Sequence, residues 1–104
     1  VEVWPKWFEI LEATADSALL RFGLGNEYLK RDDAATAATH FARAVEFDPA
    51  YSAAWKLLGK ARDAAGDADG AADAWRRGIE VAQAKGDQQA AKEMTVFLRR
   101  VARR

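Results

Sequence analysis

Side chains that could perform catalysis are few and widely spaced in this chain. His40 is the only histidine, and there is no cysteine. A lone imidazole without a matched nucleophile or metal ligand is more often a surface residue than a general base, and we expect His40 to be exposed in mid-helix. The acidic pairs Glu9–Glu12 and Asp67–Asp69 stand where helix surfaces or first turns are expected. With no glycine-rich phosphate loop and no nucleophile motif, we expect no enzymatic activity, no cofactor and no metal site.

Four arginines near the end of the sequence form a local basic cluster: Arg99, Arg100, Arg103 and Arg104. Cations in the last turn of a helix interact favourably with the helix dipole, and this accounts for the cluster adequately. The alternative is contact with an acidic protein surface, a membrane surface or nucleic acid. Sixteen basic and sixteen acidic side chains cancel to a formal net charge of zero. We therefore expect no dedicated nucleic-acid partner.

Length and composition indicate one soluble domain spanning residues 1–104. No stretch approaches the roughly 20 apolar residues of a membrane span, and the first residues lack the pattern of a signal peptide. The absence of cysteine fits a reducing compartment, so we expect a cytoplasmic protein. The chain does not begin with Met, which leaves open that it is excised from a longer protein.

The sequence repeats itself with a period of 34 residues, because residues 18–51 and residues 52–85 follow the same pattern. The shift aligns Leu24 with Leu58, Gly25 with Gly59, Ala37 with Ala71 and Phe41 with Trp75. A unit of this length cannot bury its own apolar face, so it stacks on its neighbours in a solenoid.

Alanine-rich segments between turn signals predict two helices in each unit. The first unit has Asp16 or Ser17 as its first cap, an Asp32–Asp33 turn, and Pro49 as a stop. In the second unit we expect Ser52 to cap the first helix, and a Gly–Asp pair to separate the two helices. Additional helices are predicted at 5–15 and 87–102.

These paired helices resemble the tetratricopeptide repeat. Within its 34-residue unit, the pattern has a large residue at place 4, leucine at place 7, glycine at place 8, tyrosine at place 11, alanine at place 20, phenylalanine at place 24, alanine at place 27 and proline at place 32. The first unit supplies Arg21, Leu24, Gly25, Tyr28, Ala37, Phe41, Ala44 and Pro49, and the second supplies Trp55, Leu58, Gly59, Arg62, Ala71, Trp75, Gly78 and Gln83. Arg21, Arg62 and Gln83 depart from the pattern. The missing proline at Gln83 suggests that the second helix of that unit runs longer.

The resemblance implies an all-α solenoid of two tetratricopeptide units, with an N-terminal helix at 5–15 and a capping helix at 87–102. A strict period puts polar residues in the last helix at the places of Trp55, Leu58 and Gly59, namely Gln89, Lys92 and Glu93. We therefore expect that helix to close the stack rather than to begin a third unit.

In this family the first helix of each unit lines a concave surface. The corresponding positions here are Leu19, Phe22, Asn26, Leu29, Lys30, Lys56, Lys60 and Asp63. The resemblance implies that they contact a peptide, although the lysine–asparagine clamp that some members use for a terminal carboxylate is incomplete here. Two other interpretations remain: Leu19 and Phe22 belong to the core under the N-terminal helix, or Lys56 and Lys60 are solvated surface charges.

The resemblance implies a non-enzymatic protein–protein interaction module, an adaptor or scaffold that holds a protein or peptide. One alternative is a self-assembly domain that forms a homodimer through an edge carrying Trp4 and Trp7. Another is a regulatory domain excised from a larger protein. The identity of the partner, and the choice between monomer and homodimer, stay open.

Overall fold

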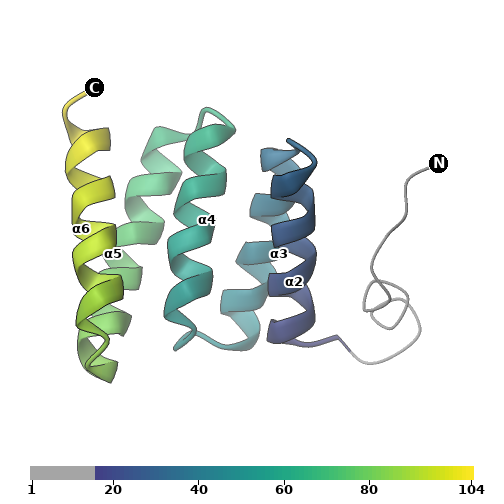
Figure 1. Cartoon of the computed structure of the whole chain (residues 1–104), viewed down its shortest axis with the longest axis horizontal. Helices are drawn as coiled ribbons and strands as arrows, with labels where there is room; N and C mark the ends of the chain where they lie inside the picture. The colour runs from purple at the N-terminus through teal and green to yellow at the C-terminus, as the bar shows by residue number, and fades with distance from the viewer. Residues whose placement is uncertain (1–15) are drawn as a thin grey trace.

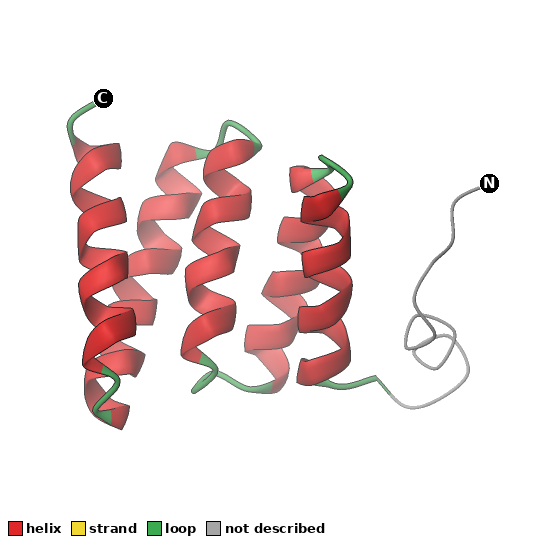
Figure 2. Cartoon of the chain, in the orientation of Figure 1, coloured by secondary structure: helices red, strands yellow, loops and turns green. Residues whose placement is uncertain are grey.

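A computed structural model describes residues 16–104, and α-helices connected by short loops form this part (Figure 2). The helices are α2 (Ala18–Lys30), α3 (Ala34–Phe47), α4 (Ser52–Ala64), α5 (Ala68–Lys85) and α6 (Gln88–Ala102). They stand in two layers, with α2, α4 and α6 in front and α3 and α5 behind (Figure 1). The all-α prediction is thereby confirmed. The helix expected at 5–15, together with Trp4, Trp7, Glu9 and Glu12, lies outside the described residues.

Short polar side chains cap the N-termini of four of these helices. The side chains of Ser17, Asp33, Asp67 and Asp87 accept hydrogen bonds from the backbone N–H groups of Leu20, Thr36, Gly70 and Ala90, at 2.9–3.2 Å. These caps satisfy N–H groups that have no partner inside the helix. Left-handed backbone at Asp32 (φ 62°), Gly66 (φ 89°) and Gly86 (φ 77°) reverses the chain before three of them.

The start of α4 differs from the sequence prediction, because Ser52 does not cap it. Tyr51 holds the capping position and makes no side-chain capping hydrogen bond. Ser52 is buried at 5% exposure, and its hydroxyl donates to the Asp87 carboxylate (3.3 Å). The serine therefore links the start of α4 to the start of α6. A cap pattern read along one helix cannot reveal a partner 35 residues away.

Each unit is closed by an aromatic ring that lies directly on a glycine of the preceding helix. Phe41 is fully buried, and a Cβ added at Gly25 would lie only 2.7–2.8 Å from three atoms of its ring. Trp75 covers Gly59 in the same way and is 2% exposed. Because glycine has no side chain, the two helices of a unit approach closely enough for the ring to fill the space between them.

The length of α5 sets the register of α6. α5 has 18 residues and α3 has 14, in line with the missing proline at Gln83. Counting from the first residue of each helix, Met94 stands where Leu24 and Leu58 stand, and all three are buried at 0–2% exposure.

The strict period therefore placed the wrong residues in α6. Ala91, Met94 and Thr95, rather than Gln89, Lys92 and Glu93, correspond to Trp55, Leu58 and Gly59. α6 packs on α5 as α4 packs on α3, in the place of a first helix of a further unit.

The outer edge of α2 contains a polar cluster that explains why Arg21 stands at a place usually held by a large apolar residue. Its guanidinium is 2.6 Å from the Asp16 carboxylate and 2.9 Å from Nδ1 of His40. The His40 ring also stacks on Tyr28, with 5.3 Å between ring centroids. His40 is thus half-buried, and the expectation that it is exposed was wrong.

Candidate functional site

The eight residues predicted to contact a peptide lie on α2 and α4, both in the front layer of Figure 1. On α2, Leu19 is 70% exposed, which is unusual for a large apolar side chain. Phe22 is half-buried, stacked on Tyr51 with 4.8 Å between centroids and edge-on to Phe41 at 5.7 Å. Leu29 also packs against the core. Leu19 is therefore the apolar side chain of this group that α2 offers most fully to solvent.

The two polar candidates on α2 interact within their own helix. The Asn26 amide donates to the backbone oxygen of Phe22 (3.2 Å), which leaves its side-chain oxygen available as an acceptor. Lys30 is exposed, and its ammonium lies 3.4 Å from the Glu27 carboxylate. An exposed pair at this distance is weak, so Lys30 can turn to another anion at little cost.

The three candidates on α4 all contact α6 or the residues that follow it. Lys56 pairs with Glu93 across the two helices at 3.2 Å. The Lys60 ammonium lies over the Phe97 ring, 5.3 Å from its centroid. Asp63 accepts two hydrogen bonds from the guanidinium of Arg104, one of them at 3.0 Å. This pairing raises the pKa of Arg104 above its ordinary value.

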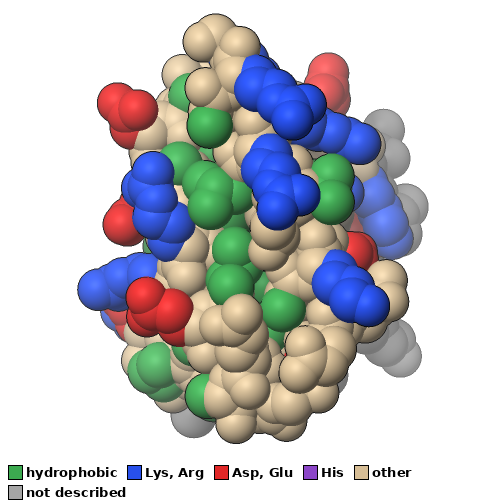
Figure 3. Space-filling view, turned by 90° about the vertical axis from the view of Figure 1, so that its left-hand side faces the viewer, with side chains coloured by type: hydrophobic (Ala, Val, Ile, Leu, Met, Phe, Trp, Pro, Cys, Tyr) green, Lys and Arg blue, Asp and Glu red, His purple; other side chains and the backbone are tan. Residues whose placement is uncertain are grey.

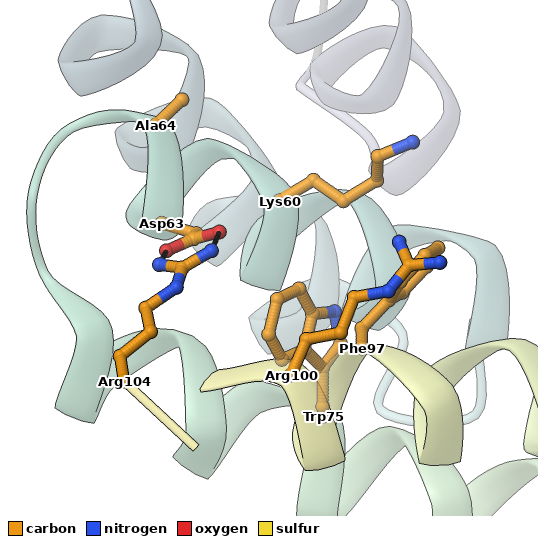
Figure 4. A pocket seen from close by; sticks show the side chains of 7 residues that line it. All are labelled: Lys60, Asp63, Ala64, Trp75, Phe97, Arg100 and Arg104. Atoms are coloured by element: carbon orange, nitrogen blue, oxygen red, sulfur yellow. Dashed lines mark hydrogen bonds and ion pairs between the residues drawn. The ribbon is translucent and has the colours of Figure 1, made fainter. Parts of the chain in front are cut away.

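Lys60 and Asp63 are brought together at a cavity of about 300 Å³. Its lining residues come from α4, α5 and α6 and from the residues after α6: Lys60, Asp63, Ala64, Trp75, Phe97, Arg100 and Arg104 (Figure 4). The Trp75 indole lies at its base, tilted against Phe97 with 5.4 Å between centroids. No residue of α2 lines this cavity, so the predicted positions divide between two regions of the front layer.

Positive charge gathers around the α6 end of the stack. In the view onto that end, Lys and Arg side chains lie around a strip of hydrophobic side chains (Figure 3). Arg99, Arg100 and Arg103 are all exposed. Lys60 and Arg100 make no ion pair with any residue between 16 and 104, although Lys56 and Arg104 each do. The cavity therefore has two positive groups available to an anion.

Four aromatic or charged residues of the cavity were not predicted to belong to a site: Trp75, Phe97, Arg100 and Arg104. Trp75 was aligned with Phe41 in the repeat, Phe97 was given no role, and Arg100 and Arg104 were taken as charges that complement a helix dipole. The signal that could have found them is the register of α6. Counted from its first helical residue, Phe97 holds the place of Ala61, on the side of α6 that faces α4.

The cavity lining combines aromatic rings with cationic side chains. Between residues 16 and 104, no set of His, Asp and Glu side chains could hold a metal ion. The half-buried His40 lies in the polar cluster beside Arg21, whereas the cavity is lined by α4, α5 and α6. In the same part of the chain, no helix has the length and apolar character needed to cross a membrane.

Comparison with known proteins supports the pattern of paired helices. A scan against protein-family models finds no match. A TPR repeat-containing protein of Pseudomonas aeruginosa is 59% identical over 95 residues, which are 91% of this chain and 90% of that protein. The solution structure of a Bordetella parapertussis protein has a TM-score of 0.80 at 46% identity, covering 94% of this chain and 85% of that one.

A crystal structure of a tetratricopeptide repeat domain protein from Salinibacter ruber has a TM-score of 0.76 at 32% identity, covering 84% of this chain and 97% of that one. With glycine–aromatic contacts in both units and this degree of identity over most of its length, the chain belongs to the tetratricopeptide-repeat family.

Proposed function

We propose that this chain is a non-enzymatic adaptor whose front layer, formed by α2, α4 and α6, holds a segment of a partner protein. Tetratricopeptide-repeat domains are generally protein–protein interaction modules. The observation that carries the proposal is the open cavity between α4 and α6, which combines an aromatic base with two positive groups, Lys60 and Arg100, that have no acidic partner in the described part. Aromatic anchors and arginines are the residue types that dominate protein interfaces.

The eight predicted residues divide into two roles in this proposal. Leu19, Asn26 and Lys30 offer an exposed apolar group, a free amide oxygen and a weakly paired cation on α2. Lys60 offers a cation beside an aromatic ring on α4. Phe22 and Leu29 support the α2 surface from beneath, Asp63 fixes Arg104, and Lys56 fixes α4 against α6. Rigid helices hold these groups in place, so little conformational entropy is lost on binding.

A capture experiment with the full chain tests this proposal. Proteins retained from a bacterial lysate by immobilised wild type are compared with those retained by Leu19→Glu/Lys60→Glu. Both positions are exposed, so the fold should survive, as equal melting temperatures would verify. Phe22 is avoided because its ring packs against Phe41 and Tyr51.

The matched control is Val96→Glu/Lys92→Glu, which makes the same chemical changes at exposed positions on α6 that do not line the cavity. We expect a partner that wild type and control retain and the Leu19→Glu/Lys60→Glu variant loses. A partner that only the control loses would place binding on the α6 end of the stack and contradict the proposal.

A further inference from the structure

We infer that the cavity between α4 and α6 recognises an acidic peptide segment in which a carboxylate stands beside an aromatic or branched apolar side chain. This inference rests on the proposed function and names the chemistry of its ligand. It depends on three properties of the cavity: an apolar base, two positive groups without an intramolecular anion, and a lining carboxylate that is already neutralised.

The base of the cavity accepts apolar groups only. The indole N–H of Trp75 donates to the backbone oxygen of Lys56 (3.1 Å), so its single donor is already used. Phe97 lies against that indole and is half-buried, so part of its ring remains exposed. A second aromatic ring or a branched aliphatic group can contact Phe97 without leaving any polar atom unsatisfied.

The edge of the cavity attracts anions. Lys60 and Arg100 are both exposed, and neither pairs with an acidic residue in the described part of the chain. Their side chains extend in a similar direction from α4 and α6 in Figure 4. Two like charges that share one cavity repel each other, and a carboxylate between them removes that repulsion while gaining charge-assisted hydrogen bonds.

The one acidic residue that lines the cavity does not repel an incoming carboxylate. Asp63 is held by the fork of the Arg104 guanidinium, which matches both carboxylate oxygens. An incoming carboxylate therefore meets a neutral ion pair on the Asp63 side and, on the Lys60 side, cations that have no acidic partner in the described part of the chain. Without Arg104 the same cavity would present an uncompensated negative charge.

The size of the cavity limits what enters it. A volume of about 300 Å³ is at the lower end of the range for small-ligand pockets, which is room for one large side chain and an adjoining carboxylate. The rest of the ligand lies outside, along the front layer. Single-stranded nucleic acid also combines rings with negative charge, but two cations are few for a backbone that carries a charge at every nucleotide.

The test uses the full ¹⁵N-labelled chain and a defined probe, the capped tetrapeptide acetyl-Glu-Phe-Glu-Glu-amide. Two matched peptides replace either the three glutamates by glutamines or the phenylalanine by alanine. We expect the first peptide to shift the indole N–H resonance of Trp75 and the amide resonances around Phe97 in a saturable way. Because one peptide loses the charge-assisted hydrogen bonds and the other loses the buried ring, each matched peptide should bind at least about tenfold more weakly, which is about 1.4 kcal/mol.

Two double variants with the same change of charge locate the binding. Lys60→Gln/Arg100→Gln should weaken the first peptide by about tenfold or more. Lys92→Gln/Arg99→Gln changes exposed residues that do not line the cavity and should leave the Kd within about twofold. All variants are checked for wild-type melting before titration.

Several outcomes would overturn the inference: equal weakening by both double variants, equal binding of the glutamine peptide, tighter binding of a thymidine tetranucleotide, or no saturable shift at about 5 mM peptide. Saturable shifts confined to α2 would also overturn it. That last result, or capture of a partner that depends on Leu19 but not on Arg100, would leave the proposed function standing while removing this cavity from it.

Discussion

Replacing Gly59 by alanine is the sharpest test of how the second unit is packed. A Cβ at this position would stand 2.5 Å from Cδ1 of the Trp75 indole and closer still to its Nε1 and Cε2. Real Cβ atoms essentially never approach a neighbour within 3.0 Å, so the indole must move. The ring is 2% exposed and packed against Phe97, so it has little space to move into.

The size of the effect follows from three contributions. Overpacking a core of this kind costs about 1–3 kcal/mol. Moving the indole also lengthens its hydrogen bond to the Lys56 oxygen, which contributes about 0.5–1.5 kcal/mol. Alanine has the better helix propensity, which offsets about 1 kcal/mol of this loss. We therefore expect Gly59→Ala to lower the free energy of unfolding by about 1–3 kcal/mol, or the Tm by roughly 5–20 °C.

The assay is urea unfolding followed by circular dichroism, with Lys60→Ala as the control for an alanine at the adjacent, exposed helix position. The control should change stability by less than about 0.5 kcal/mol. In a Trp75→Leu background the clash is absent, so Gly59→Ala should be neutral or slightly stabilising there. An unchanged midpoint in the wild-type background, or the same loss in both backgrounds, would refute this account. If Trp75→Leu alone unfolds the chain, Gly25→Ala against Phe41 repeats the test in the first unit.

Contacts at the two ends of the stack lead to further predictions. Burial, reinforced by the charge of Arg21, lowers the pKa of His40 below its ordinary value of 6.5, so the folded state favours the neutral ring. Its contribution is complete above pH 6.5 and is lost as the pH falls through the lowered folded pKa, so stability should decrease below pH 6.5, and less steeply in His40→Gln. Equal slopes in urea titrations would contradict this. Asp87→Ala removes the cap on Ala90 and the partner of Ser52 and should cost about 1 kcal/mol; an unchanged urea midpoint would contradict that role.

The pairing of helices could be predicted from sequence because it depends on local signals. Asp33 and Asp67 cap the second helix of each unit, and left-handed backbone precedes both. Glycine recurs at positions 25 and 59, and the aromatic residues that pack on these glycines recur 16 residues later in both units. Each of these contacts lies within one unit and recurs in the other, so a comparison of the two units in this sequence reveals them.

Contacts between units were harder to predict, because they depend on helix lengths, and these differ from unit to unit. The longer α5 moves α6 by two residues relative to a strict period, which changes which residues face α4. For this reason Phe97 and Arg100 were not connected with Lys60, although all three line one cavity. His40 was misjudged for a similar reason: its partners Arg21 and Tyr28 belong to the neighbouring helix.

Because α6 lies at one end of the described stack, a ligand in the cavity should change how often α6 opens locally. α6 packs mainly on α5, and its links to α4 are isolated side-chain pairs such as Lys56–Glu93. When stability is approximately a sum of nearest-neighbour terms, an end element opens more often than a central one. A ligand that touches both Lys60 and Arg100 would add a link between α4 and α6. Occupancy should therefore slow amide hydrogen exchange in α6 far more than in α3, so that the stack becomes more rigid at one end on binding.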